Sequence, residues 1–428
     1  KIGADKSSYF RIASMSKSFT AMAILKLRDE GKLRLDEDAS LYIPLLKKTT
    51  YLTSDAPPIT VRNLLTHSAG FPEDNPWGDR QLADTDKDLM DFIQKGVSFS
   101  NVPGVAYEYS NLAFALLGHI ITKVSGKPYQ VYITENILKP LGMTHTVWEY
   151  TKVPQAKLAH GYRWLNNSWQ EEPLLHDGAY GAMGGLITTI EDFTKYMALQ
   201  LSASPPRNDA ENGIIKRSSL REMQQPWRFG GLNAAYKYVG TNRPCPMASF
   251  YGYGLRITKD CAGITAVGHT GGLPGFGSNW MILPEYGIGV MCFANLTYAS
   301  TSAVNLQVLD TLVALARLKP RQLPPSAILK QQQQALVRLL PDWKGAEQSG
   351  LFAENFFLDY PIDSLKKEAQ EVFAKAGRIL KIRELIPENN LRGSFIMEGE
   401  KSNLLISFTL TPENPPLIQE YHIKEIPK

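Results

Sequence analysis

A serine and a lysine three residues apart, Ser14 and Lys17, could supply a nucleophile and its base. Residues at this spacing share one face of a helix. A serine hydroxyl is a poor nucleophile until a base takes its proton, and burial or neighbouring cations can lower the pKa of a lysine enough for that task. We expect Ser14 at a helix start, where free backbone N–H groups favour developing negative charge. The spacing alone is weak evidence for a catalytic pair, because a helix cap beside a solvated lysine gives the same pattern.

A second candidate motif, Tyr-Ser-Asn, contains Tyr109 and Asn111 and precedes a long apolar run. A tyrosine hydroxyl beside a lysine can shuttle protons, because cationic neighbours lower its pKa. The Asn111 amide can donate to a substrate carbonyl and accept from Lys17. The alternative is a plain helix N-terminus with a half-buried tyrosine.

A third motif, His-Thr-Gly-Gly, comprises His269, Thr270, Gly271 and Gly272 and follows a short apolar run. A glycine within a strand lets another backbone or a ligand approach closely. The N–H of Gly272, together with that of Ser14, could form an oxyanion hole. The alternative is a hairpin turn with a solvent-facing histidine.

In this order the motifs resemble those of the penicillin-recognising serine hydrolases, and within them the class C β-lactamase branch with its DD-carboxypeptidases, D-aminopeptidases and esterases. The segments Val-Arg-Asn-Leu-Leu-Thr-His-Ser-Ala-Gly-Phe-Pro at 61–72 and Ala-Met-Gly-Gly-Leu-Ile-Thr-Thr at 182–189 extend the resemblance, which covers residues 8 to about 318. His67 lies in the first of these segments, and we expect it to be structural.

The resemblance implies a role for each motif residue. Ser14 would be the nucleophile, and Lys17 and Tyr109 would share the general base and acid work. Asn111 would position the substrate amide, and the strand with His269, Thr270, Gly271 and Gly272 would bind substrate. An acyl-enzyme would form and then be hydrolysed, which splits one difficult step into two.

Two features depart from the family pattern. His269 stands where a lysine is common, and histidine is mostly neutral at pH 7 whereas lysine carries a charge suited to a carboxylate. The exchange favours esters, amides or peptides without a free carboxylate in that place. In addition, only 13 residues precede Ser14, where the family has a helix and two strands. Their absence would leave a sheet edge unpaired, so we expect a trimmed chain.

These features favour a serine hydrolase that cleaves amide or ester bonds in a D-amino-acid peptide, a peptidoglycan stem peptide or a small ester. A class C-type β-lactamase is one alternative. A catalytically dead penicillin-binding or sensor protein is another.

The resemblance implies a mixed α/β fold, with an antiparallel sheet flanked by helices and an all-helical lobe. Apolar patterns predict buried helices at 19–27 and 111–124, a helix from 190 that Thr189 and Asp192 cap as a box, and strands over 251–293. We expect a hydrolase domain at 1–318, a linker at 319–339 and a small α+β domain at 340–428. The last has predicted helices near 346–358 and 362–376 before its strands, an order that loosely resembles the nuclear-transport-factor fold.

Composition excludes several classes of protein. The 428 residues are 43% hydrophobic, so the chain can bury a core and is not disordered. The net charge of +4 is too small for a nucleic-acid footprint. No run of about 18 apolar residues indicates a membrane span. The histidines and cysteines lack metal-ligand spacing. We therefore expect a small-molecule or peptide substrate as the partner and no metal or other cofactor; the oligomeric state stays open.

The three cysteines leave two readings open. Cys245 and Cys261 could pair and leave Cys292 free, or all three could be separate thiols. The chain begins Lys-Ile-Gly-Ala-Asp without an initiator methionine, as after removal of a targeting segment. On this ground and the family resemblance we expect a periplasmic or cell-surface location.

Overall fold

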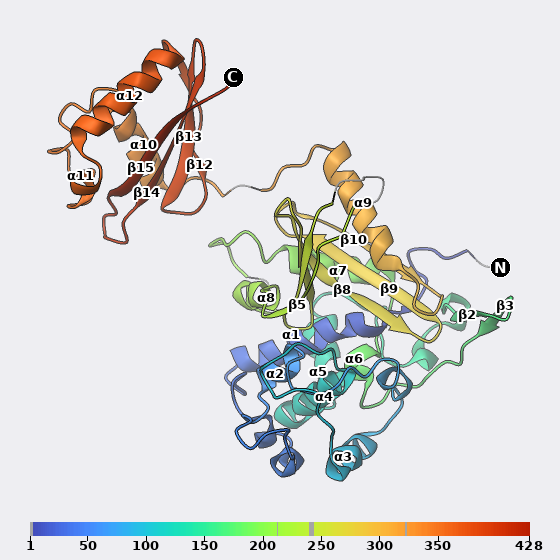
Figure 1. Cartoon of the computed structure of the whole chain (residues 1–428). Helices are drawn as coiled ribbons and strands as arrows, with labels where there is room; N and C mark the ends of the chain where they lie inside the picture. Colours follow the sequence, from blue (N-terminus) through green and yellow to red (C-terminus); the bar gives the residue numbers. More distant parts are fainter. Residues whose placement is uncertain (1–2, 212, 239–243, 322) are drawn as a thin grey trace. The chain divides into compact units, whose positions relative to one another are not determined.

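The computed structural model describes residues 3–211, 213–238, 244–321 and 323–428. The chain divides into two compact units, Lys1–Lys319 and Pro320–Lys428 (Figure 1). Each unit has its own hydrophobic core.

The first unit contains a six-stranded antiparallel sheet with strand order β10-β9-β8-β7-β6-β5. Its strands are β5 (Arg228–Asn233), β6 (Met247–Tyr251), β7 (Arg256–Lys259), β8 (Thr265–Leu273), β9 (Phe276–Leu283) and β10 (Ile288–Ala294). The predicted antiparallel strands are thus confirmed. Residues 251–257 begin the predicted strand region with the alternating run Tyr-Gly-Tyr-Gly-Leu-Arg-Ile, but they form the end of β6, a turn and the start of β7. Gly254, at φ +64°, makes that turn, because glycine adopts a positive φ without steric cost.

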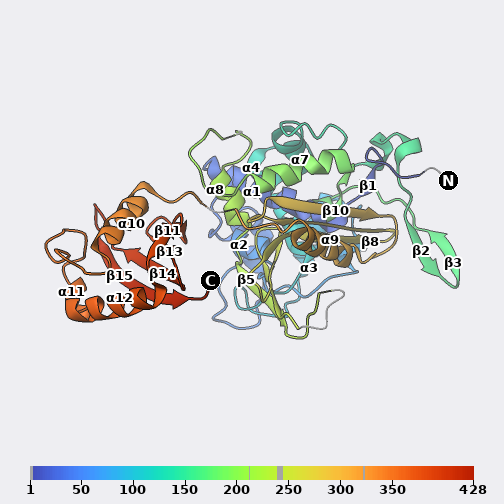
Figure 2. The ribbon, with the colours of Figure 1, turned by 90° about the horizontal axis from the view of Figure 1, so that it is seen from above.

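Helices lie on both sides of this sheet (Figures 1 and 2). Helix α9 (Thr301–Leu315) packs on β9 and β10. Helix α1 (Lys17–Asp29) lies between the sheet and a helical lobe and contacts α4 (Asn111–Ser125). The other helices of this unit are α2 (Val61–Leu65), α3 (Asp86–Lys95), α5 (Tyr129–Ile133), α6 (Gly181–Gly184), α7 (Ile190–Leu201) and α8 (Arg217–Met223). The remaining strands form two small pairs, β1 (Phe10–Arg11) with β4 (Ile187–Thr188) and β2 (Tyr162–Leu165) with β3 (Ser168–Glu171).

The sequence explains why the two central helices begin and end where they do. The side chains of α1 are apolar on nearly every face, and Phe19, Met22 and Leu25 are fully buried, as predicted. In α4 the Ser110 hydroxyl caps the first turn by accepting from Ala113 N at 3.2 Å, and Gly126 ends the helix at φ +71°.

Helix α7 differs from the predicted capping box. Thr189 does accept from the Asp192 N–H, at 3.2 Å. The Asp192 carboxylate instead accepts from His145 N at 2.7 Å and Thr146 Oγ1 at 3.0 Å. It therefore joins α7 to a neighbouring loop rather than completing the box.

The second unit is an α+β domain. Its sheet has the order β11-β13-β14-β15, with β12 also paired to β13. The elements are α10 (Ala327–Leu339), α11 (Phe356–Asp359), α12 (Ile362–Ala376), β11 (Ile379–Ile382), β12 (Ile386–Pro387), β13 (Arg392–Gly399), β14 (Asn403–Leu410) and β15 (Ile418–Ile426).

Two predictions for this region need correction. Within the predicted linker 319–339, residues 327–339 form α10, which buries Leu329 and Leu336 in the second core. The predicted helix at 346–358 is only α11, since Gly350 takes φ +67° and the chain turns there. The likeness to the nuclear-transport-factor fold stays a prediction.

Cys245 and Cys261 form a disulfide, and Cys292 is free. The first of the two readings of the cysteines is therefore the one the structure adopts. In the part of the chain that the structure describes, none of the helices combines the length and the hydrophobicity that a membrane span requires.

Candidate active site

The nucleophile candidate lies in a tight turn that is held against the sheet. Ser14 belongs to a 3₁₀ turn, Ala13–Ser16, that runs directly into α1. Ala13 has φ +49°, a left-handed conformation that costs a non-glycine residue about 1–3 kcal/mol and often marks functional sites. The Ser278 hydroxyl in β9 donates to Ile12 O at 2.8 Å and fixes the start of the turn.

Gly271 in β8 lets this turn come close. A Cβ added at Gly271 would lie 2.2 Å from Ile12 O. The predicted close approach at this glycine is thus the approach of the nucleophile segment itself. A Cβ at Gly272 would lie 2.5 Å from the Tyr298 ring, so the second glycine makes room for a side chain. The N–H groups of Ser14 and Gly272 remain our predicted oxyanion hole.

Lys17 is fully buried and makes three hydrogen bonds through its Nζ. It donates to Ser14 Oγ at 3.0 Å, to Asn111 Oδ1 at 2.7 Å and to Met183 O at 3.0 Å. Burial lowers the pKa of Lys17 to about 7, although the nearby carboxylate of Asp79 opposes this shift. A lysine that titrates near neutrality, within hydrogen-bond reach of a serine, can act as its general base.

Tyr109 lies beside both catalytic candidates. Its hydroxyl shares a hydrogen bond with Ser14, and its ring lies 4.9 Å from Lys17 Nζ, measured to the ring centroid. Burial nevertheless raises the pKa of Tyr109 above its usual value, and the charge of Arg256 only partly offsets that. The expected lowering by cationic neighbours is therefore outweighed, and Tyr109 stays a neutral O–H donor.

Asn111 accepts from Lys17, as predicted, and its Nδ2 donates to Asn75 Oδ1 at 2.6 Å. Its backbone N–H donates to Asp74 Oδ1 at 2.6 Å, and that of Leu112 to Asp74 Oδ2 at 2.8 Å. Asp74 thus places a carboxylate at the N-terminus of α4, where the helix dipole favours negative charge. Neither Asp74 nor Asn75 was a candidate from the sequence, because no motif joins them to a helix more than 30 residues away.

The His269 ring is packed against Tyr251 and Tyr109, with centroid distances of 5.8 and 6.3 Å. His269 lies within β8, is 1% exposed, and bonds through Nε2 to the Tyr251 hydroxyl at 2.9 Å and through Nδ1 to Thr270 O at 2.5 Å. Burial, with the charges of Arg256 and Lys17, holds the pKa of His269 well below its usual value. The alternative of a solvent-facing histidine in a hairpin turn is wrong, and the predicted direct contact of His269 with substrate finds no support in this placement.

A pocket of about 370 Å³ opens at five of the predicted residues. Its wall includes Ser14, Tyr109, Thr270, Gly271 and Gly272, together with the unpredicted Asp79, Arg256 and Tyr298. The structure therefore brings the three motifs together at one cavity.

Two of the unpredicted residues carry charge. Burial raises the pKa of Asp79 to about 6, even though the Tyr298 hydroxyl donates to Asp79 Oδ2 at 2.9 Å. Arg256 is exposed and lies over the Tyr109 ring, with its Cζ 5.2 Å from the centroid. A Tyr-Gly-Leu-Arg run before β8 was visible in the sequence, but nothing in it distinguished Arg256 from a surface arginine.

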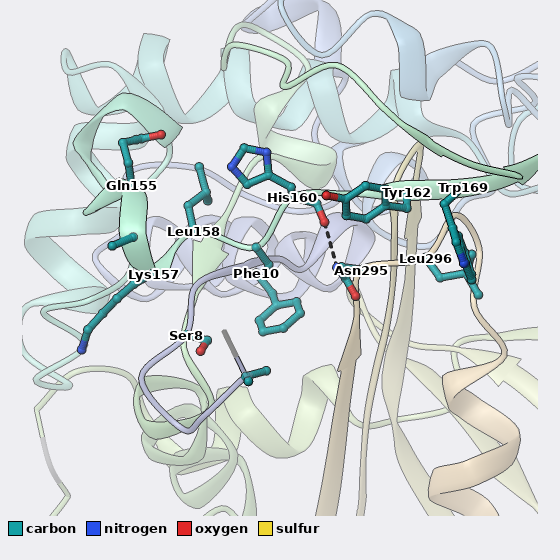
Figure 3. Close-up of a pocket in the computed structure, with 14 residues that line it drawn as sticks. Ser8, Phe10, Gln155, Lys157, Leu158, His160, Tyr162, Trp169, Asn295 and Leu296 are labelled. Atoms are coloured by element: carbon teal, nitrogen blue, oxygen red, sulfur yellow. Dashed lines mark hydrogen bonds between the residues drawn. The ribbon is translucent and has the colours of Figure 1, made fainter. Parts of the chain in front are cut away.

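A larger cavity, of about 840 Å³, lies elsewhere in the first unit (Figure 3). Its lining includes Phe10, Leu158, Tyr162 and Asn295, whose Nδ2 donates to the backbone oxygen of His160 at 2.9 Å. None of the motif residues lines it, so size alone does not identify the reactive site. Within the described ranges, no group of three or more His, Cys, Asp or Glu side chains could hold a metal ion.

The fold and this site together define a class of protein. A serine–lysine pair lies at the head of a helix under an antiparallel sheet, and a tyrosine and an asparagine from a helical lobe complete the site. This is the arrangement of the penicillin-recognising serine hydrolases. The chain belongs to the β-lactamase family, whose model, described as "Beta-lactamase", matches residues 1–314.

Curated relatives agree with this assignment. Protein flp of Staphylococcus aureus (strain N315) is 29% identical over 306 residues, which are 69% of this chain and 54% of that protein. Beta-lactamase-like protein 2 of Dictyostelium discoideum is 33% identical over 247 residues, 56% of this chain and 42% of that protein. The chain thus spans about half the length of the curated relatives it matches.

Solved structures share the fold. A D-stereospecific amidohydrolase from Streptomyces sp. matches with TM-score 0.56 and 24% identity over 71% of this chain and 86% of its own. A penicillin-binding protein from Bacillus halodurans matches with TM-score 0.54 and 25% identity, over 73% of this chain and 87% of its own. An octameric penicillin-binding protein homologue from Pyrococcus abyssi matches with TM-score 0.57 and 22% identity, over 98% of this chain and 89% of its own.

Proposed function

We propose that this protein is a serine hydrolase that cleaves amide or ester bonds through an acyl-enzyme on Ser14. The substrate classes are D-amino-acid peptides, peptidoglycan stem peptides and small esters. The observation that carries the proposal is the 3.0 Å contact of Ser14 Oγ with Lys17 Nζ, whose pKa burial lowers to about 7.

Acylation would use the groups as they lie. Neutral Lys17 takes the proton of Ser14 as Oγ bonds to the carbonyl carbon, and the N–H groups of Ser14 and Gly272 hold the resulting oxyanion. When the tetrahedral intermediate collapses, the bond to the leaving nitrogen or oxygen breaks. The leaving atom takes a proton from the neutral Tyr109 hydroxyl. Lys17 then returns the proton it took from Ser14 to Tyr109, so both groups are neutral again. Water, deprotonated in turn by Lys17, then hydrolyses the acyl-enzyme.

Two comparisons support amides as substrates. The Streptomyces protein is named a D-stereospecific amidohydrolase, and it shares the fold of this chain. The family description itself names an enzyme that opens a cyclic amide. Both bear on the class of bond rather than on the particular substrate.

The test is covalent labelling followed by turnover. We expect a fluorophosphonate probe to add once to the intact protein, with the adduct on Ser14 by peptide mapping, and Ser14→Ala to abolish both labelling and hydrolysis of an ester and D-peptide panel. Ser300→Ala is the matched control, since Ser300 is an exposed serine of the same pocket.

Each of the two alternative functions predicts a different result of these experiments. Nitrocefin turnover as fast as ester turnover would favour the class C-type β-lactamase. An unlabelled Ser14, with neither a fluorophosphonate nor a penicillin adduct, would favour a dead binding or sensor protein and overturn the proposal.

We also propose a location in the periplasm or at the cell surface. The Cys245–Cys261 disulfide supports this, because disulfides persist in oxidising compartments. Thiol alkylation in intact cells before lysis tests it: a reduced pair there would contradict the proposal.

A further inference from the structure

A hydrogen bond joins the helical lobe to the sheet at the proposed active site. The Tyr298 hydroxyl donates to Asp79 Oδ2 at 2.9 Å, although the two residues lie 219 positions apart in the chain. Asp79 belongs to a 3₁₀ turn, Gly78–Arg80, that contacts α4, whereas Tyr298 follows β10. Both residues line the pocket that contains Ser14. The bond therefore connects two walls of that pocket.

The backbone and the neighbouring hairpin hold the Tyr298 ring in one place. Tyr298 has φ +52°, a left-handed conformation that is strained for a residue with a Cβ. Its N–H donates to Phe276 O, at the start of β9, at 3.1 Å. The ring lies against Gly272, where an added Cβ would be 2.5 Å from it. Such strain persists only where the surrounding structure enforces it, and it is common at functional sites.

The Asp79 carboxylate depends on the Tyr298 hydroxyl. Asp79 is 1% exposed, and its Oδ1 has no hydrogen-bond partner among the described residues. Arg80 and Arg163 are near enough to act electrostatically on the pair. Both arginines, however, contact the carboxylate of Glu172, at 3.8 and 2.5 Å. Since a buried carboxylate is costly without a hydrogen bond, the Tyr298 donor stabilises the ionised form of Asp79.

The charge of Asp79 acts in turn on Lys17. Burial lowers the pKa of Lys17 to about 7, and Asp79 is the carboxylate that opposes this most, ahead of Asp74, while Arg256 reinforces it. The Tyr298 hydroxyl lowers the pKa of Asp79 because it donates to the carboxylate, although burial has the larger, opposite effect. Without that donor, Asp79 would take up a proton more readily and would lose its influence on Lys17.

The other titratable side chains around Lys17 carry no charge near neutral pH. Burial lowers the pKa of His67 and that of His269 well below their usual value. Burial also raises the pKa of Tyr109 above its usual value. A change in the charge of Asp79 therefore reaches Lys17 without compensation from these three groups.

Resting on the proposed function, we infer that Tyr298 is a positioning residue whose hydroxyl holds the Asp79 carboxylate, and with it a negative charge, in the pocket wall that faces the proposed base. Tyr298 acts through Asp79 and touches no reacting atom. Its role is to set the pH range in which Ser14 is acylated. A tyrosine that only joined the lobe to the sheet would affect stability and leave that pH range unchanged.

The test is the pH dependence of fluorophosphonate labelling of Ser14, measured on the full chain. We expect Tyr298→Phe, which keeps the ring and removes the donor, to move the midpoint to lower pH by at most about one unit, since the bond acts on Lys17 only through Asp79. Asp79→Asn should move the midpoint in the same direction and at least as far. The double variant should match Asp79→Asn, because the hydroxyl then has no carboxylate on which to act.

Tyr42→Phe is the matched control, because it removes a tyrosine donor from the carboxylate of Glu37, at 2.6 Å, outside the pocket. Its midpoint should equal that of the wild-type protein. A Tyr298→Phe midpoint equal to that of the wild-type protein would overturn the role of Tyr298. A shift in the double variant larger than that of Asp79→Asn would overturn it too, because Tyr298 would then not act through Asp79.

A measurement on Lys17 itself separates this inference from the proposed function. NMR titration of protein with isotope-labelled lysine, in which Lys17 is the signal absent from Lys17→Met, gives the pKa of Lys17 without any reaction at Ser14. If this pKa falls in Tyr298→Phe but Ser14 does not label, only the hydrolase function is overturned. If Ser14 labels normally and the pKa of Lys17 is the same in Tyr298→Phe, only the role of Tyr298 is overturned.

Discussion

The Lys17 ammonium donates to Asn111 Oδ1 at 2.7 Å, which joins two motifs that lie 94 residues apart in the chain. Through this contact the proposed base at the head of α1 is held by the first residue of α4. The remaining two donors of Lys17 are bonded to Ser14 and Met183. Lys17 can therefore accept the serine proton only after it has lost one of its own, and this makes the reaction sensitive to pH.

Acylation of Ser14 should follow the titration of Lys17. Burial lowers the pKa of Lys17 to about 7, so the neutral, reactive form increases as pH rises. We expect the second-order rate of probe labelling to increase tenfold per unit below pH 7 and to level off above it. Lys17→Met should lower kcat/KM by about 10²- to 10⁴-fold, the usual loss of a general base.

Asp79 provides a check on that assignment. Its carboxylate raises the pKa of Lys17 by electrostatic attraction, so Asp79→Asn should move the midpoint of the pH profile to lower pH. A labelling rate that stays constant or falls between pH 6 and 8 would contradict Lys17 as the base. A midpoint that Asp79→Asn leaves unchanged would contradict it as well.

A methyl group at Gly271 should displace the nucleophile turn. The added Cβ would lie 2.2 Å from Ile12 O, a backbone atom two residues before Ser14. Since misplacement by about 1 Å can cost 10²-fold in rate, Gly271→Ala should lower kcat at least that much. Gly230→Ala in β5, where the nearest atom is 3.4 Å away, should leave kcat unchanged, and equal kinetics of the two variants would refute this view of the turn.

Removing the Asp74 carboxylate should weaken both stability and catalysis. It accepts from the Ser110 hydroxyl and from the N–H groups of Asn111 and Leu112, so Asp74→Ala should cost about 1–3 kcal/mol in the free energy of unfolding. Because Asn111 also holds Lys17, kcat/KM should fall as well.

The comparison is Asp88→Ala, which removes a capping carboxylate from α3, a helix without motif residues. Denaturant unfolding should show a smaller loss, and kcat/KM should stay at the wild-type value. If Asp74→Ala keeps full activity, Asp74 caps the helix without positioning the site.

The thiol content should reflect the disulfide. Unfolded, unreduced protein should give one titratable thiol per chain, that of Cys292, and reduced protein should give three. Cys261→Ser should lower stability by about 3 kcal/mol, the value for a closed loop of about 15 residues. Three thiols without reductant would show that the bond does not form.

The local elements of the fold were largely predictable from the sequence. The buried helices α1 and α4 and the strands between β6 and β10 follow from apolar periodicity and from glycines at their ends. The errors occurred where the chain turns on a glycine with positive φ, at Gly254 and Gly350, because alternation and helical propensity do not show that such a glycine will be used as a turn.

The grouping of the candidate catalytic residues was likewise predictable, because Ser14, Lys17, Tyr109 and Asn111 belong to motifs and the structure brings them into contact. Asp74, Asp79 and Arg256 were missed because each reaches the site through the path of a loop or the register of a strand. The burial of His269 could not be predicted for a related reason, because it depends on packing against Tyr251; its contact with substrate stays a prediction.

The loop from Asp74 to Asp79 both positions Asn111 and lines the pocket, so a substitution in the loop affects the two roles together. Asp74 and Asn75 bond to Asn111, and a Cβ at Gly78 would lie 2.7 Å from the Asn111 Cβ, while Asp79 lines the pocket. A substitution here that admits a new substrate would also disturb the residue that holds Lys17. Divergence toward new substrates, in nature or in the laboratory, should therefore proceed through residues 299–302, which line the same pocket outside this loop, where the shape of the pocket can change without disturbing Asn111.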